Sequence, residues 1–188
     1  MRGRIAVLAA VLLTFSGSLP AADPKPIETF RAYAASLGTG QTSLLTVSIN
    51  RWSTDEEREM LLTTLQEFGR DKLIDALTKI RPPVGYMRLP NTIGYDLYYA
   101  RNHPNPDGSR RIVLATDRDV NFREAAKNTR SMQYRLTLIE IHLDKDGKGD
   151  GKLVPAAKVS WDKTAKKIEV EDYNALPVDL LNVQRTKP

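Results

Sequence analysis

Apolar and polar residues alternate with a period of two in the segment 45–50 (LTVSIN). This period is expected of a strand that buries one face, so the segment is predicted to be a strand. The preceding segment, 30–36, has small residues at alternate positions and fits either a first strand or a short helix.

The pattern changes to a helical period after Ser53. Ser53 or Thr54 can accept a hydrogen bond from an amide of the first turn, and the acidic residues at 55–57 lie where the helix dipole favours negative charge. The apolar residues that follow at helical spacing are Leu61, Leu65 and Phe68. Gly69 can close this helix in a left-handed conformation.

A second helix is predicted directly afterwards, with Asp71 as its N-terminal cap. Its apolar face consists of Leu73, Leu77 and Ile80. Pro82 and Pro83 forbid its continuation. The sequence therefore predicts a helical hairpin between Ser53 and Ile80.

After Val84 the sequence predicts strands joined by short polar turns. The expected strands are 95–99, 112–116, 134–143, 153–161, 168–173 and 178–183. The expected turns are 102–109, 144–151 and 162–167, with a short helical turn at 121–128. Segment 134–143 has apolar residues on both faces and is expected to be central. This succession indicates an α+β, β-dominated fold: an antiparallel meandering sheet or partly closed barrel with one inserted helical hairpin.

The first residues have the order of a secretory signal peptide. Residues 1–4 are basic, residues 5–15 (IAVLAAVLLTF) are almost entirely apolar, and small residues up to Ala22 follow a helix-breaking SGS triplet. The apolar run is shorter than the ~20 residues that cross a bilayer. We expect cleavage near Ala22 and export to the periplasm or the medium. The expected organisation is a signal peptide at 1–22, a flexible leader at 23–29 and a single β-rich domain at 30–188.

Composition and charge narrow the classes of protein further. The chain has no cysteine, which excludes disulfides, thiol chemistry and a lipid anchor on a cysteine. The formal charge of +5 falls to +3 when Arg2 and Arg4 leave with the signal peptide, and basic and acidic residues are interleaved. Because nucleic-acid binding calls for a concentrated basic face, no nucleic-acid partner is expected. No second apolar run approaches membrane-spanning length, so we expect no transmembrane segment in the mature chain.

The segment 144–151 (DKDGKGDG) begins like a calcium-binding loop, with aspartates at alternate positions. The third ligand position is Lys148 and the twelfth is Pro155, where oxygen ligands are needed. Glycine-rich pairs of this kind are also what tight hairpin turns require. We therefore predict a hairpin turn, and assign no metal-binding residue.

The chain has two histidines, and neither comes with the partners of a known catalytic arrangement. Glu140 and His142 are two residues apart and are expected to share the solvent face of a strand. His103 is expected to be an exposed loop residue. No nucleophile motif of the GxSxG type accompanies either histidine, so no catalytic or cofactor-binding residue is assigned.

Four tyrosines, which are Tyr86, Tyr95, Tyr98 and Tyr99, gather in one stretch. Tyr95 and Tyr99 are expected to share one strand face, with Tyr98 on the other. Core and cross-strand packing is the favoured interpretation, and a ligand-binding wall remains the alternative.

Three segments carry a resemblance to known sequences: RWSTDEERE at 51–59, GYDLYYAR at 94–101 and TLIEIHL at 137–143. In these segments the mature chain resembles a group of uncharacterised exported bacterial proteins. The resemblance implies export from a bacterial cell and implies no activity, cofactor or site residue.

Two hypotheses for function follow, and the sequence leaves open whether the protein is an enzyme. The favoured one is a non-catalytic binding or interaction module of the cell envelope or medium, with a small molecule or an envelope protein as its partner. The alternative is a secreted hydrolase. Its candidate carboxylates are Asp96, Asp117, Asp119 and Glu140.

Overall fold

A computed structural model describes residues 25–36, 40–90, 92, 94–118, 136–155, 157–171 and 176–186. The expected signal peptide at 1–22 and the helical turn expected at 121–128 lie outside the described residues.

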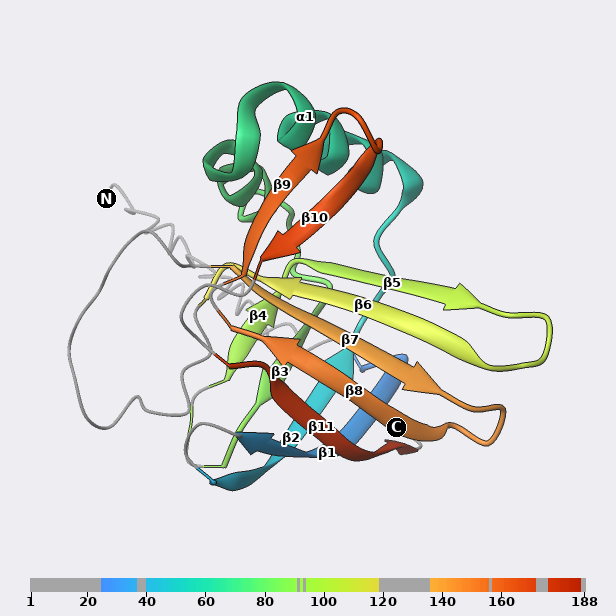
Figure 1. Cartoon of the computed structure of the whole chain (residues 1–188). Coiled ribbons are helices and arrows are strands. Elements are labelled where there is room, and N and C mark those ends of the chain that lie inside the picture. Colours follow the sequence, from blue (N-terminus) through green and yellow to red (C-terminus); the bar gives the residue numbers. More distant parts are fainter. Residues whose placement is uncertain are drawn as a thin grey trace, which may run out of the picture.

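Nine antiparallel strands form one large sheet (Figure 1). They are β1 (Glu28–Ser36), β2 (Thr42–Ile49), β3 (Gly85–Arg88), β4 (Tyr95–Leu97), β5 (Tyr99–Pro104), β6 (Arg110–Thr116), β7 (Thr137–Leu143), β8 (Lys148–Val154) and β11 (Val178–Thr186). Their order in the sheet is β4-β3-β2-β1-β11-β8-β7-β6-β5. The predicted α+β, β-dominated fold is confirmed, and the antiparallel sheet is nearly closed into a barrel. β7 is an inner strand that pairs with β6 and β8, although β11 is the middle strand in the order.

Tyr98 is the residue at which the barrel nearly closes. It alone separates β4 from β5, which are the two outermost strands of the sheet, so the chain itself joins the two edges. Its amide donates to the carbonyl of Ala115 on β6 (3.0 Å). Ser53 adds a second link, because its amide donates to the carbonyl of Ala100 (2.8 Å) and its Oγ accepts from the Ala100 amide (3.0 Å).

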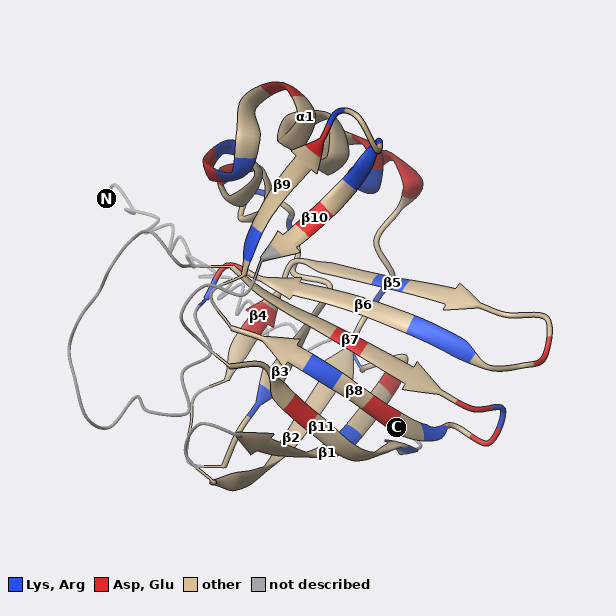
Figure 2. Ribbon diagram, in the orientation of Figure 1, with Lys and Arg blue, Asp and Glu red and all other residues tan. Residues whose placement is uncertain are grey.

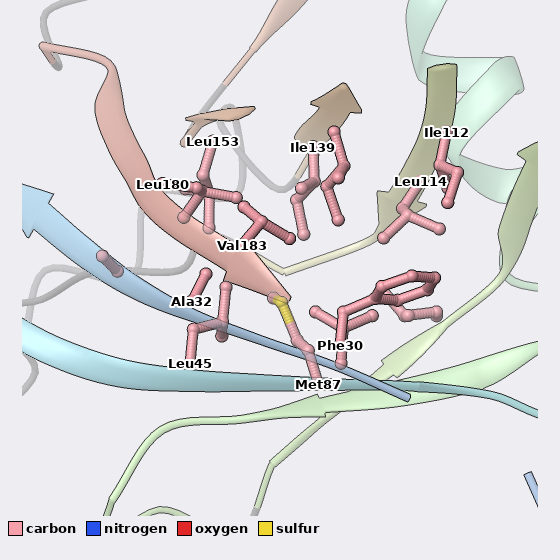
Figure 3. Close-up of a cluster of buried hydrophobic side chains, with 14 of the residues drawn as sticks. Phe30, Ala32, Leu45, Met87, Ile112, Leu114, Ile139, Leu153, Leu180 and Val183 are labelled. Carbon is pink, nitrogen blue, oxygen red and sulfur yellow. The ribbon is translucent and has the colours of Figure 1, made fainter. Parts of the chain in front are cut away.

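The interior of the barrel is filled by side chains. Figure 3 shows residues of strands from opposite sides of the barrel pointing toward one another. The largest of the completely buried ones include Phe30, Leu45, Met87, Ile112, Ile139, Leu153 and Leu180. They come from alternate positions of their strands, the period that the sequence predicted for half-buried strands. The barrel interior is therefore a packed core, and a ligand site has to be sought outside it.

The two consecutive helical segments predicted between Ser53 and Ile80 are present as α1 (Asp55–Leu77), a single helix with a kink at Gly69 rather than a separate pair of helices. Thr54 caps it: its side chain accepts from the Glu57 amide, and the Glu57 carboxylate accepts from the Thr54 amide. Gly69 has φ 78° and ψ −174°, a conformation that ends one helical segment before the next begins.

The predicted apolar stripe of the first helical segment is wrong at Phe68, which is 66% exposed. The interruption at Gly69 follows immediately and changes the phase of the helix. Leu61 and Leu65 are buried before it, and Ile74 and Leu77 after it. Phe68 instead borders a shallow hollow on the other side of α1.

Two further strands, β9 (Lys158–Asp162) and β10 (Lys167–Glu171), form a separate hairpin that lies against α1 (Figure 1). The expected single strand at 153–161 is therefore wrong. Pro155 has no amide to donate, so the ladder of β8 stops at Val154. The Ala157 amide then donates to the Leu136 carbonyl (2.6 Å), which turns the chain out of the barrel.

The first and last strands pair with each other near the ends of the chain. The segment at 30–36, which fitted a strand or a helix, is a strand, and β1 begins two residues earlier at Glu28. β11 includes the last strand predicted at 178–183 and continues to Thr186.

Candidate ligand-binding groove

A groove of about 1150 Å³ lies outside the barrel, between its wall, α1 and the β9–β10 hairpin. The wall includes residues of β5, β6, β7, β8 and β11. Most of the lining is apolar, with charged residues at the edges. We refer to this space as the groove.

Strand register arranges the barrel wall in rows that run across neighbouring strands. The apolar row consists of Tyr99, Ala115, Leu138 and Val154. The mixed row consists of Arg101, Val113, Glu140 and Lys152. The charged row consists of His103, Arg111, His142 and Asp150. Because these rows follow one another along the strands, the wall changes from apolar to charged from one end to the other.

The residues of α1 on this side also change from charged to apolar along the helix. Asp55, its first residue, forms an ion pair with Arg101 of the mixed row, which holds the start of α1 against β5. Arg58 comes one turn later and also lines the groove. Leu61 and Leu65 follow and pack in one cluster with residues of the apolar row.

The β9–β10 hairpin supplies a third wall of the groove, and part of the apolar face of this hairpin is exposed to solvent. Its pairing opposes Ile168 to Trp161 and Val170 to Val159, so these four side chains share one face. Val159 and Trp161 pack against the cluster beneath α1. Ile168 and Val170 also line the groove, yet they are 49% and 47% exposed. Apolar surface of this kind is available to an apolar ligand.

The charged end of the groove has a positive field. Burial lowers the pKa of His103, and the nearby guanidinium groups of Arg111, Arg101 and Arg58 lower it further. Burial raises the pKa of the Tyr99 hydroxyl, which Arg101 and Arg58 oppose. Arginines from β6, β5 and α1 therefore place positive charge near His103, and two of them also place it near Tyr99.

Glu140 is an acidic residue of this region that has two ionic neighbours. Its Oε1 lies 2.8 Å from His142 Nε2 and 3.8 Å from Arg111 Nη1. The prediction that Glu140 and His142 share the outer face of a strand is confirmed. The expectation for His103 is wrong: it is half-buried in β5 and pairs with Arg111, because β5 continues to Pro104 before the turn begins.

The carboxylates considered for hydrolysis lie in different places. Asp96 is on β4 and Asp117 follows β6. Burial raises the pKa of the Tyr98 hydroxyl, and the negative charges of Asp117 and Asp96 raise it further. Glu140 is on the groove wall. Asp119 lies outside the described residues. The three described carboxylates are thus divided between the region of Tyr98 and the groove.

The tyrosines are also divided. Tyr95 is buried in the barrel core, Tyr98 is buried on the helix side with the Arg81 guanidinium 5.0 Å from its ring centroid, and Tyr99 lines the groove. The expectation that Tyr95 and Tyr99 share a face is wrong because Tyr98 interrupts the ladder between β4 and β5. Tyr86 is 43% exposed on β3.

The segment 144–151 is confirmed as part of a hairpin between β7 and β8, in which residues 144–147 form the turn and β8 begins at Lys148. Asp144 Oδ1 accepts hydrogen bonds from the amides of Asp146 and Lys148, both at 2.9 Å. Gly147 has φ 75°, which a glycine adopts without steric cost. Within the described ranges, no group of three or more His, Asp or Glu side chains is placed to hold a metal ion. In the same part of the chain, no helix is both long and apolar enough to span a membrane.

The residues that sequence reasoning missed are Arg58, Arg111, Ile168 and Val170. The signal was present only in part: Arg111, Val113 and Ala115 alternate with the buried residues of β6 and so had to face outward. Comparison of the chain with protein-family models, curated proteins and solved structures finds no match.

Proposed function

We propose that this protein is a non-catalytic binding protein that holds an elongated apolar or amphipathic small molecule in the groove. The observation that carries the proposal is the pair Ile168 and Val170, two apolar side chains about half exposed on the wall of a largely apolar groove. A bound apolar chain would remove this surface from water, which favours binding by roughly 25 cal/mol per Å² of apolar surface.

The division of the described acids between two regions favours binding over hydrolysis. Hydrolysis by paired carboxylates needs two acids within about 5–10 Å on either side of the scissile bond. Glu140 has a histidine and an arginine as its ionic neighbours. Asp150 and Asp179 also line the groove, and strand register places Asp150 opposite His142 and Asp179 opposite Lys152, so each acid of the lining has a basic residue or a histidine beside it.

The expected signal peptide extends this proposal to location. A chain cleaved near Ala22 would carry its ligand in the periplasm or the medium, where an apolar molecule needs a protein to keep it in solution. The intact mass of the protein purified from an exporting host tests this part, since a product that retains Met1 would contradict it.

Tryptophan fluorescence tests the binding proposal directly. Trp161 lines the groove, whereas Trp52 packs against the barrel core, so Trp52→Phe leaves the groove residue as the reporter. Titration with decanol should change the emission saturably. Ile168→Asp combined with Val170→Asp should weaken binding at least tenfold. Leu44→Asp, which changes a similarly exposed apolar residue outside the groove, is the matched control.

A further inference from the structure

The groove lining contains charged residues as well as apolar ones. The basic residues in its lining are Arg58, Arg111, Lys152, Lys166 and Lys167. The acidic residues in its lining are Glu140, Asp150 and Asp179. Basic side chains therefore outnumber acidic ones along its walls, and Figure 2 shows basic stretches on both β6 and β10.

The basic residues differ in how far acids already neutralise them. Strand register places Lys152 between Glu140 and Asp179, so it has an acidic neighbour on each side. Lys167 lies 3.9 Å from Glu169. Arg58 and Lys166 have no ion pair with any residue that the structure describes, and Arg111 has only the 3.8 Å contact with Glu140. Arg58 and Arg111 thus retain donors for an anion that arrives from solution.

Arg58 and Arg111 also come from different walls of the groove. Arg58 is on α1, one turn after the ion pair of Asp55 with Arg101, and Arg111 is on β6 in the charged row. Both side chains line the groove, and the positive charge of each lowers the pKa of His103. Arg58 also opposes the rise in the pKa of the Tyr99 hydroxyl, which lines the groove in the apolar row.

We infer that this end of the groove binds the anionic head group of a single-chain amphiphile, whose apolar chain runs along the strand direction, past Val113, to the apolar row. Arg58 and Arg111 hold the anion, because guanidinium groups bind carboxylates and sulfates with paired, charge-assisted hydrogen bonds. The apolar chain extends toward Leu65 and Leu138. From the charged row to the apolar row is about 13 Å by strand rise, which gives room for an extended alkyl chain.

This inference rests on the proposed function, and the experiment separates the two. The full mature chain is titrated by calorimetry with decanol, decanoate, decyl sulfate and decylammonium while circular dichroism monitors the fold. Decanol is kept below its solubility limit and the ionic compounds below their critical micelle concentrations. Decanoate or decyl sulfate should bind about tenfold tighter than decanol, which is the ratio that one net charge-assisted hydrogen bond supplies. Decylammonium should bind most weakly. The affinities for decanoate and decyl sulfate, compared with each other, show which anion the site prefers.

Charge reversal tests the residues. Arg58→Glu and Arg111→Glu should each bring the affinity ratio of decanoate to decanol toward one, and the double variant should reverse the preference between decanoate and decylammonium. Arg88→Glu, an exposed arginine on β3 outside the groove, is the matched control and should preserve the ratio. Equal affinities for decanol and decanoate in the unmodified protein would overturn the head-group site and leave the binding proposal standing. Absence of binding to all four compounds would overturn both.

Discussion

Arg110 and Glu28 form an ion pair across one end of the barrel. Arg110 Nη1 donates to Glu28 Oε1 at 3.0 Å, and Nη2 lies 2.9 Å from Oε2. Glu28 begins β1 and Arg110 begins β6, and three strands separate β1 from β6 in the sheet. The Arg110 guanidinium also lies 5.7 Å from the centroid of the Phe30 ring, and Arg185 of β11 lies 3.4 Å from Glu28. These contacts cover the core at this end with paired opposite charges, although Glu28 Oε2 is buried without a hydrogen bond.

Arg110→Ala should therefore destabilise the barrel. The two side chains are only 15% and 12% exposed, so the substitution leaves Glu28 poorly solvated with Arg185 as its remaining partner. The expected loss is about 2 kcal/mol, between the values for exposed and fully buried pairs. Urea denaturation measures it. Arg111→Ala, which changes the neighbouring outward-facing arginine, should cost about 0.5 kcal/mol or less, and equal losses in the two variants would contradict the assignment.

Gly69→Ala should destabilise the protein through the backbone alone. Its φ of 78° with ψ −174° is a region that residues with a Cβ avoid, and a Cβ built there meets no atom within 4 Å. The cost is expected to be about 1–3 kcal/mol, measured as a shift of the unfolding midpoint. Glu67→Ala, an exposed change in the same helix, serves as the control and should shift stability by less than about 0.5 kcal/mol. An unchanged midpoint for Gly69→Ala would show that α1 can straighten without loss.

Acid should strengthen the binding of decyl sulfate. Burial, Arg111, Arg101 and Arg58 lower the pKa of His103 below its ordinary 6.5, while Glu140 opposes them. The free protein therefore gains this positive charge only as the pH falls below about 6.5, and a bound sulfate favours the protonated form. Because the sulfate stays ionised, affinity should rise roughly threefold or more from about pH 7.5 to pH 5.

Two variants assign that pH dependence to a residue. His103→Gln should remove much of it, and His142→Gln, which changes the other histidine of the charged row, should leave a clear rise. Calorimetric titration across the pH range measures both. The opposite pattern would place the titrating group at His142, and a flat profile in the unmodified protein would contradict the role of either histidine.

Local sequence patterns predicted the elements whose causes are local. The period of two in β2 and the helix start after Ser53 or Thr54 depend on neighbours within a few residues, and both were predicted; the structure selects Thr54 as the cap. The break after β8 was missed although Pro155 carries the signal, because an apolar run continues on both sides of it. Closure of the barrel depends on hydrogen bonds of Ser53 and Tyr98 with residues far along the chain, which no local pattern contains.

The groove could not be predicted because its walls come from three distant parts of the chain. Alternation along β6 shows that Arg111 and Val113 face outward, but it does not show that α1 and the hairpin cover them. Ile168 has the pattern of an ordinary strand residue until the register with Trp161 places both on the face toward the groove. The site is thus a property of tertiary packing, and its residues carry no motif.

The carboxylates of Asp144 and Asp146 distinguish a hairpin turn between β7 and β8 from a calcium-binding loop. Asp144 Oδ1 accepts two backbone hydrogen bonds, whereas the Asp146 carboxylate is exposed and accepts none from a described residue. Asp144→Ala should therefore lower stability by about 1 kcal/mol, and Asp146→Ala should be nearly neutral.

In a calcium loop both carboxylates would be ligands, so both substitutions would matter and calcium would raise the melting temperature. Lys148 within the loop adds positive charge where a cation would have to sit. Thermal melting of the unmodified protein and the two variants, each with and without calcium, measures all of these quantities. A calcium-dependent rise in melting temperature that either variant removes would contradict the hairpin interpretation.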